Sequence, residues 1–352
     1  MEHIAIFIKN IYSGGAEKQS VLLAKVLVND FIVHYIIFDG KKIHRKYLEM
    51  LEDDDKINVI AFQGGYCSRF KQLVCYLKNN NIKSIFSYLT AANTYACIAG
   101  RITGIKVFTG LRNAELPLFK CIIDKFLTNY CCEKAIANCY SGKRNFILHG
   151  FNKEQIVVIP NCFEDVKNYY KKKCNEKIHI ITVGRFVPQK DYETAIKTIA
   201  NIKMKCEHIV FDIVGYGQLE QQIRNWIKCY EVDDVTTIYI NPNNIPELLE
   251  RADIYLSTSL FEGTSNSIME GMNANLPIVA TNVGDNNYLI ENGVNGFLSE
   301  IKNHVALTES LFSLIRDVDL RIKMGKSSKM ILMEKFSMNQ FRSSYLDLLN
   351  NI

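Results

Sequence analysis

The sequence predicts an α/β protein of two domains, each built on a doubly wound sheet of mostly parallel strands. The chain has 352 residues, which corresponds to two domains at roughly 150 residues each. Short apolar runs alternate with longer segments of helical period along its whole length. These runs are rich in Val, Ile and Phe and apolar on both faces, which is typical of buried parallel strands.

The strand candidates fall into two series. The first lies at residues 4–9, 31–38, 57–62, 84–89, 106–111, 135–137 and 156–159. The second lies at residues 178–183, 209–214, 237–240, 254–257, 277–280 and 296–298. Between them, helical periodicity predicts helices that include residues 17–27, 192–201, 219–230 and 246–252. This βαβα order predicts two Rossmann-like sheets in series.

A polar, Lys-rich segment at residues 161–177 separates the two series. We therefore expect an N-terminal Rossmann-like domain at residues 1–165 and a C-terminal one at 174–337. The last segment, 338–352, is expected to pack back on the first domain. Two such domains face each other across a deep cleft, with the carboxyl ends of both sets of strands at its walls.

Composition excludes several classes of protein. Hydrophobic residues make up 48% and charged residues 22% of the chain, unlike a disordered protein. The 11 cysteines are odd in number and lack a C-x-x-C spacing, so we expect neither a disulfide framework nor a zinc site. No apolar run is long enough to span a bilayer and the N-terminus lacks the pattern of a signal peptide. We therefore expect a cytoplasmic protein.

Positive charge is concentrated in the first half of the chain. Residues 1–165 hold 21 Lys and Arg against 15 Asp and Glu, whereas residues 166–352 hold 21 against 22. This excess is too small to predict nucleic-acid binding, and no RNA-binding motif accompanies it. Amphipathic helices at 66–78 and 116–130 are suited to an anionic membrane surface. The alternative for each is an ordinary helix packed on a sheet.

The loops after the strands carry the candidate site, because ligands bind at the carboxyl ends of such strands. The first strand ends in Ser-Gly-Gly-Ala-Glu, in which Gly14 and Gly15 let the backbone approach an anion at a helix N-terminus. In the second series, Gly184, Arg185 and Lys190 follow a strand, and their two cations form a natural pair for a diphosphate.

Another loop holds a Gly-x-Gly pair, Gly215 and Gly217. The third glycine of a dinucleotide-binding fingerprint is replaced by Glu220, so a tight turn near a ligand is the better interpretation.

The densest pattern runs from Glu262 to Glu270, between a strand and a helix. Thr264, Ser265 and Asn266 are good N-cap residues, so a helix is expected to begin there. Its first free amides form an anion site, expected at Asn266, Ser267 and Ile268. The two carboxylates flank this terminus and are suited to accept hydrogen bonds from sugar hydroxyls.

Together these loops resemble the retaining glycosyltransferases of the GT-B fold, in glycosyltransferase family 4 (glycosyl transferases group 1). The resemblance covers nearly the whole chain and depends above all on the E-x7-E block. It implies that Arg185 and Lys190 hold the donor diphosphate and stabilise the leaving nucleoside diphosphate. It also implies that Glu270 binds the ribose, that Glu262 binds the transferred sugar, and that the loop of Gly14 and Gly15 closes over the phosphates.

The sequence departs from the family at two places. The family often presents a His from the N-terminal domain near the reacting sugar, whereas this chain has none there. Arg112, Asn113 and Glu115 are the candidates for the acceptor side, and the residues alone do not choose among them. The usual Glu-Ala-Met-Ala also becomes Glu-Gly-Met-Asn, with Gly271 in place of Ala.

We expect no cofactor and no metal. The only D-x-D motif, Asp317 and Asp319, lies among helix-period residues and is expected on a solvated helix face. The resemblance implies a metal-independent hexosyltransferase that retains configuration by front-face attack. Its expected partners are a nucleotide-diphosphate sugar, a glycan or lipid-linked acceptor and the anionic inner face of the cell membrane.

The expected process is cell-surface polysaccharide, capsule or lipopolysaccharide synthesis. The alternatives are a nucleotide-sugar epimerase or hydrolase of the same fold, or a non-catalytic subunit that binds sugar nucleotides. A nicotinamide dehydrogenase is disfavoured because no G-x-G-x-x-G follows the first strand. The nucleoside, the sugar and the acceptor are not specified by the sequence.

Overall fold

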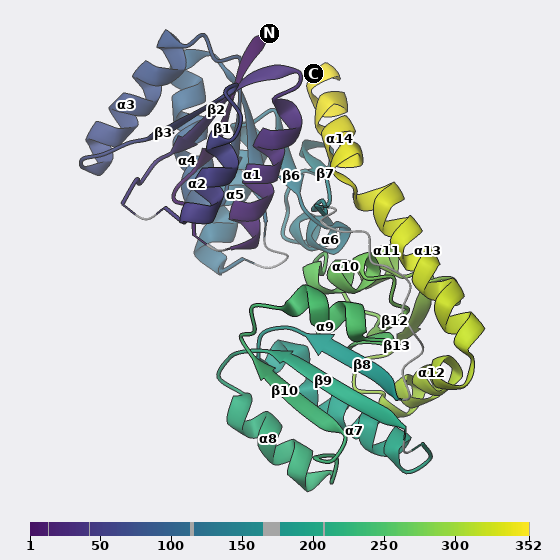
Figure 1. Ribbon diagram of the computed structural model, residues 1–352. Helices are drawn as coiled ribbons and strands as arrows, with labels where there is room; N and C mark the ends of the chain where they lie inside the picture. Colours follow the sequence, from purple (N-terminus) through teal and green to yellow (C-terminus); the bar gives the residue numbers. More distant parts are fainter. Residues whose placement is uncertain (13, 42, 113–115, 165–176, 207, 352) are drawn as a thin grey trace. The chain divides into compact units, whose positions relative to one another are not determined.

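The computed structural model describes residues 1–12, 14–41, 43–112, 116–164, 177–206 and 208–351. The chain divides into two compact units (Figure 1). One unit is Met1–Glu164 with Phe336–Ile352, and the other is Asp165–Lys335. Each contains one parallel sheet wound with helices, so the predicted fold class is confirmed.

The first unit has a 7-stranded sheet in the order β3-β2-β1-β4-β5-β6-β7. Its strands are β1 (Glu2–Ile8), β2 (Phe31–Ile37), β3 (Ile57–Ala61), β4 (Ser84–Tyr88), β5 (Lys106–Leu111), β6 (Lys134–Ala137) and β7 (Ile156–Val158). Its helices are α1 (Gly15–Leu27), α2 (Arg45–Glu52), α3 (Tyr66–Asn79), α4 (Thr90–Thr103), α5 (Leu118–Tyr130), α6 (Tyr140–Leu148), the short 3₁₀-helix η1 (Lys153–Gln155) and α14 (Met338–Asn350). The strand order reverses between β1 and β4, which is where doubly wound sheets bind ligands.

The second unit repeats this plan with a 6-stranded sheet in the order β10-β9-β8-β11-β12-β13. Its strands are β8 (Ile178–Val183), β9 (Ile209–Gly215), β10 (Thr236–Ile240), β11 (Ile254–Ser257), β12 (Ile278–Thr281) and β13 (Gly296–Ser299). Its helices are η2 (Pro188–Lys190), α7 (Tyr192–Lys203), α8 (Glu220–Cys229), α9 (Ile245–Arg251), α10 (Asn266–Asn273), α11 (Asn286–Leu289), α12 (His304–Arg316) and α13 (Val318–Phe336), whose last residue enters the first unit. Here the order reverses between β8 and β11.

Alternate residues of the strands enter two hydrophobic cores. In β1, Ile4, Ile6 and Ile8 pack in one core with residues of α1 and α14. Ala5 and Phe7 point the other way, into a core with residues of α3, α4 and α5. Burial on both faces is the reason that these strands have continuous apolar runs.

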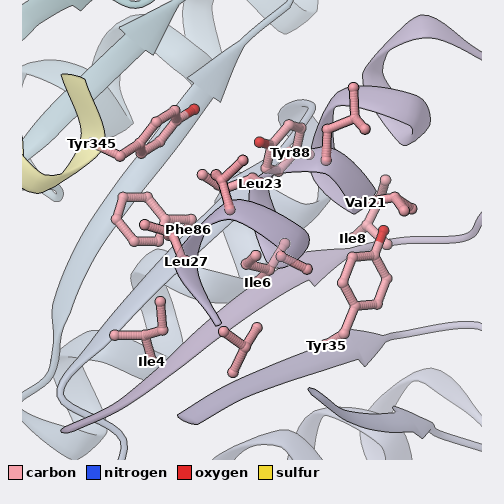
Figure 2. Packing of buried hydrophobic residues seen from close by; sticks show 14 of the residues in the cluster. Ile4, Ile6, Ile8, Val21, Leu23, Leu27, Tyr35, Phe86, Tyr88 and Tyr345 are labelled. Carbon is pink, nitrogen blue, oxygen red and sulfur yellow. The ribbon is translucent and has the colours of Figure 1, made fainter. Parts of the chain in front are cut away.

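The last helix, α14, is fixed on the first unit. Tyr345 is fully buried, and its ring meets that of Phe86 edge-on at a centroid distance of 5.4 Å (Figure 2). Arg342 holds both carboxylate oxygens of Asp30, through Nε at 2.8 Å and Nη2 at 2.6 Å. A buried aromatic ring and a bidentate ion pair together orient this helix.

The two helices considered for a membrane surface differ in the structure. In α3, Leu73 and Leu77 are buried in the core, and the buried Arg69 pairs with Asp39 at 3.2 Å. This helix is therefore an ordinary packed helix. Helix α5, in contrast, exposes most of its large apolar residues. No helix in the described part of the chain is long and apolar enough to cross a bilayer.

Candidate functional site

Two loops of the second unit lie side by side at the carboxyl edge of the sheet, after β8 and after β11. The Thr258 hydroxyl donates to the carbonyl oxygens of Lys190 at 3.0 Å and of Asp191 at 2.9 Å. The amide of Leu260 donates to the Gln189 carbonyl at 2.8 Å. These bonds join segments about 70 residues apart in sequence and fix the loops at the point where the strand order reverses.

This pairing brings together two of the residues that the sequence singled out. Lys190 Nζ donates to Glu262 Oε1 at 2.6 Å, and the two side chains are only 17% and 10% exposed. The hydroxyl of Ser259, which is buried, donates to the same carboxylate oxygen at 2.8 Å. Glu262 is therefore held by one cation and one hydroxyl in a partly desolvated setting, where such bonds are strong.

Close contacts between backbones explain the glycines around this site. A Cβ atom on Gly215 would lie 1.9 Å from the Gly184 carbonyl oxygen, and one on Gly217 would lie 2.6 Å from that of Phe186. The Gly-x-Gly pair therefore lets the β9 loop pack directly on the β8 loop, which agrees with the predicted tight turn. Gly284 has φ +56°, and a Cβ there would lie 1.9 Å from the Glu262 carbonyl oxygen.

Helix α10 begins at Asn266, as the sequence predicts, with Ser265 in the N-cap position. The first amide bonded within the helix is that of Met269, which donates to Ser265 O at 3.2 Å. The amides of Asn266, Ser267 and Ile268 precede it and point outward from the helix N-terminus. Glu270 lies about one turn into the helix. The three amides therefore lie between Glu262 and Glu270 along the chain, as predicted.

The departure at Gly271 has a structural cause. A Cβ at this position would lie 2.7 Å from the ring of Tyr255, which is buried in β11. The Tyr255 hydroxyl donates to the Val183 carbonyl at 3.2 Å, so the ring bridges α10 and the end of β8. Glycine thus makes room for a tyrosine that supports the strand ends beneath the site.

Arg185 follows β8 and is exposed. Within the described ranges it has no ion-pair partner, unlike Lys190. Its guanidinium is therefore available to an anion at the same edge of the sheet.

In the first unit, Gly14 occupies the N-cap position of α1 and Gly15 is its first residue. A Cβ on Gly14 would lie 2.2 Å from a carboxylate oxygen of Glu17. The Glu17 side chain thus folds back over Gly14 at the start of the helix, and a rotation of this side chain would make room for a Cβ.

The acceptor-side candidates are only partly described. Arg112 follows β5 and is buried, and its Nη2 donates to the Tyr345 hydroxyl at 3.0 Å. Its guanidinium carbon lies 4.3 Å from the centroid of the Tyr88 ring. Arg112 Nε and Nη1 have no hydrogen-bond partner in the described structure. Asn113 and Glu115 lie outside the described residues.

The D-x-D motif lies where α12 ends and α13 begins. Asp317 lies at the junction of α12 and α13, where its Oδ1 accepts from the amide of Leu320 at 2.8 Å. It thus caps α13, whose first turn contains Asp319, and both aspartates are exposed, as the sequence predicts. Across the described residues, no three His, Cys, Asp or Glu side chains gather closely enough to hold a metal ion.

Sequence reasoning missed the residues that support this site. Ser259 and Thr258 precede the E-x7-E block, and Tyr255 lies within the strand. The spacing of Ser259 three residues before Glu262, directly after a strand, is the one available indication. It becomes specific only once the loop conformation is known.

Comparisons with known proteins agree with this geometry. The family model described as "Glycosyl transferases group 1" matches residues 164–330. The Haemophilus influenzae protein named "Uncharacterized glycosyltransferase" is 25% identical over 350 residues, which cover 94% of this chain and 95% of that protein. The N-acetylgalactosamine-N,N'-diacetylbacillosaminyl-diphospho-undecaprenol 4-alpha-N-acetylgalactosaminyltransferase of Campylobacter jejuni is 22% identical, over 91% of this chain and 92% of that enzyme.

Among solved structures, Anabaena Alr3699/HepE in complex with UDP superposes with a TM-score of 0.85 at 19% identity, over 100% of both chains. The same protein in complex with UDP-glucose gives a TM-score of 0.81. These likenesses show the GT-B fold. Together with the family match and the full-length relatives, they lead to one conclusion: the chain belongs to the glycosyl transferases group 1 (family 4) and is a glycosyltransferase.

Proposed function

We propose that this glycosyltransferase moves a hexose-type sugar, with retention of configuration and without a metal, from a UDP-sugar to a lipid-linked glycan acceptor. The process that this serves is cell-surface polysaccharide, capsule or lipopolysaccharide synthesis at the inner face of the cell membrane. The single observation that carries the proposal is the cluster of Lys190, Glu262 and Ser259 beside the N-terminus of α10. The Anabaena structures with UDP and UDP-glucose support the choice of nucleoside.

The positive groups at this edge suit the leaving group of the reaction. Sugar transfer passes through an oxocarbenium-like transition state while negative charge grows on the departing diphosphate. Fixed positive groups aimed at that charge lower the barrier. Arg185, Lys190 and the amides of Ser267 and Ile268 have this role in the proposal. The two cations lie between β8 and α7, and the two amides lie in the first turn of α10, which follows β11.

The carboxylates bind the two sugars of the donor. Glu270 accepts from the ribose hydroxyls, and Glu262 accepts from hydroxyls of the transferred sugar. Because Glu262 already accepts from Lys190 and Ser259 through Oε1, its other oxygen, Oε2, is the one assigned to the sugar. Lys190 thereby contacts the diphosphate and the sugar-binding carboxylate together.

Retention follows from attack on the face that the leaving group occupies. In this proposal the departing phosphate oxygen takes the proton of the acceptor hydroxyl, and no side chain forms a covalent bond to the sugar. Arg112 is the described candidate on the acceptor side, because it directly follows β5 at the carboxyl edge of the sheet. Asn113 and Glu115 remain candidates from the sequence.

The acceptor is proposed to be lipid-linked because the Campylobacter jejuni relative is named for a diphospho-undecaprenol acceptor. The excess of positive charge in residues 1–165 is consistent with an anionic membrane surface.

The test is product analysis with UDP-sugars, with and without a sugar-diphosphate-undecaprenol acceptor. We expect UDP release that depends on the acceptor, and NMR of the product should show the anomeric configuration of the donor. An excess of EDTA should leave the rate unchanged.

Other outcomes point to the alternatives. A new nucleotide-sugar isomer formed without acceptor identifies an epimerase, and free sugar identifies a hydrolase. Loss of activity in EDTA with recovery in manganese contradicts the metal-independent mechanism. An inverted anomer contradicts retention.

A further inference from the structure

Helix α5 carries its large apolar residues on the outside. Leu118, Phe119 and Tyr130 are 76%, 74% and 68% exposed, and Ile122 and Phe126 are exposed as well. These positions recur about every four residues and so line one side of the helix. A helix on a globular protein normally turns such a stripe toward the core.

The side of α5 that faces the protein is fixed by polar contacts. Asp124 is buried and accepts from Thr90 Oγ1 at 2.6 Å and from Asn93 Nδ2 at 3.1 Å. Cys121 and Thr128 are buried on the same side. These contacts set the rotation of α5 about its axis, so the outward direction of the apolar stripe is part of the folded structure.

Helix α4 extends the stripe on one side. Arg101 Nη2, near the end of α4, donates to the carbonyl of Tyr130 at the end of α5, at 3.1 Å. Ile98 and Ile102 on α4 are exposed. The two helices therefore lie side by side and share an apolar surface.

Helix α6 extends it on the other side. A cavity of about 260 Å³ is lined by residues of α5, α6 and their flanks: Leu116, Cys121, Asn145, Phe146 and His149. Leu148, at the end of α6, is 84% exposed. The apolar surface of the first unit is thus defined by the exposed side chains of α4, α5 and α6, and it is larger than a scatter of single residues.

The charged groups of this apolar surface are of one sign. The three helices contain the basic residues Arg101, Lys120, Lys125, Lys143 and Arg144. Their only acidic residue is Asp124, which is buried and hydrogen-bonded. Apolar side chains edged by cations are typical of helices that lie in the interface of an anionic bilayer. A second copy of the same surface would be repelled by the same charges.

We propose that the apolar surface of α4, α5 and α6 binds the anionic leaflet of a bilayer. Phe119 and Phe126 enter the acyl region, and Lys120 and Lys125 meet the head groups. The inference rests on the proposed function, because a lipid-linked acceptor lies in a membrane and the enzyme must reach it there. Its test requires no sugar transfer.

The experiment is flotation of the full chain with phosphatidylcholine vesicles and with vesicles that also contain phosphatidylglycerol. We expect binding to the anionic vesicles. The double variant Phe119→Ser/Phe126→Ser should lower the partition coefficient about tenfold or more. Lys120→Gln/Lys125→Gln should lower it about fivefold for each charge removed, and added salt should reduce that difference.

Matched controls come from α3, which also carries exposed aromatic and basic side chains. Tyr66→Ser and Lys71→Gln/Lys78→Gln should bind the vesicles as the wild type does. Equal binding of the phenylalanine variant and the wild type would overturn the proposal. The proposal would also be overturned if the wild type did not bind anionic vesicles, or if it formed a dimer that the phenylalanine variant abolished.

A second measurement reports insertion directly. The chain has a single tryptophan, Trp226, in the second unit. Phe126→Trp should be quenched by lipids brominated on the acyl chain, whereas Trp226 in the wild type should not. Unquenched fluorescence overturns insertion of α5. If the wild type binds the vesicles but does not bind UDP, that result contradicts the proposed function and leaves the membrane-binding surface supported.

Discussion

Lys190 Nζ lies 2.6 Å from Glu262 Oε1, although the two residues are 72 positions apart. One belongs to the loop after β8 and the other to the loop after β11, the strands between which the sheet order reverses. The pair therefore links the group assigned to the leaving diphosphate with the group assigned to the transferred sugar. The ion pair and the hydroxyl of Ser259 fix the orientation of both groups relative to each other.

Lys190→Ala tests the role of the cation. Removal of one group that stabilises charge in a transition state typically costs about 10²–10³ in rate. We expect turnover to fall by this order while the circular dichroism spectrum stays that of the wild type. The control is Lys197→Ala, which removes a lysine paired with Glu193 on α7 at 2.9 Å. Turnover near the wild-type value in Lys190→Ala would rule out the assignment.

Ser259→Ala tests whether the hydroxyl positions Glu262. A hydrogen bond to a charged group contributes about 1.5–3 kcal/mol, which corresponds to about 10- to 100-fold in kcat/KM if it is lost in the transition state. We expect a decrease in that range, measured by UDP release. Ser344→Ala removes a partly exposed hydroxyl of α14 that bonds the Gln340 carbonyl, and it should have no effect on this rate. Equal rates for both variants would show that Glu262 is held by Lys190 alone.

Gly284→Ala tests the contact beneath Glu262. The residue has φ +56°, which alone costs a non-glycine residue about 1–2 kcal/mol. The new Cβ would also collide with the Glu262 carbonyl. We expect a lower midpoint of thermal unfolding. We also expect a lower rate of sugar transfer than that of the wild type at temperatures where the variant is still folded.

Gly293→Ala is the matched control for this variant. Gly293 has φ +81°, and no atom lies within 4 Å of a Cβ built there. It therefore incurs the backbone strain without the collision. If both variants lose stability and activity equally, the contact between Gly284 and the Glu262 loop does not matter.

His34 predicts a pH dependence of stability. Burial lowers the pKa of His34 from 6.5 to about 4, and the neighbouring His3 adds to the effect. Between these values the unfolded chain binds a proton that the folded chain does not. The contribution of neutral His34 to the free energy of unfolding is therefore complete above pH 6.5 and is lost as the pH falls toward 4.

We expect His34→Gln to lose less stability than the wild type between about pH 7 and about pH 5, by thermal unfolding. Glutamine keeps a partner for the Tyr76 hydroxyl, which lies 2.9 Å from His34 Nδ1. His208→Gln, at an exposed position, should leave the pH profile unchanged. Identical profiles for His34→Gln and the wild type would contradict the role of His34.

The fold follows from the sequence because both faces of each sheet are covered. In β1, Ile4 and Phe7 enter opposite cores, so the run is apolar throughout and is recognisable without an alignment. Helix surfaces are harder to predict. Helices α3 and α5 share an amphipathic period, yet α3 buries Leu73 and α5 exposes Phe126. The buried contacts of Asp124 decide this, and a sequence does not display them.

At the site, the sequence predicts residue types but not their contacts. The E-x7-E spacing predicts Glu262 and Glu270 on either side of a helix start, which the structure has at Asn266. The bond from Ser259 depends on a loop conformation that Gly284 permits. The burial of Arg112 against Tyr345 depends on a contact 233 residues away, which no local pattern reveals.

The most direct test of the donor site is a thermal-shift panel of UDP-, GDP-, ADP- and CMP-sugars on the wild type and Arg185→Ala. A ligand at 100 times its dissociation constant adds about 2.7 kcal/mol, which raises the unfolding midpoint by a few degrees. The account predicts that UDP-sugars stabilise the wild type and not the variant. A wild type that no nucleotide sugar stabilises, or a variant stabilised as strongly as the wild type, would contradict it.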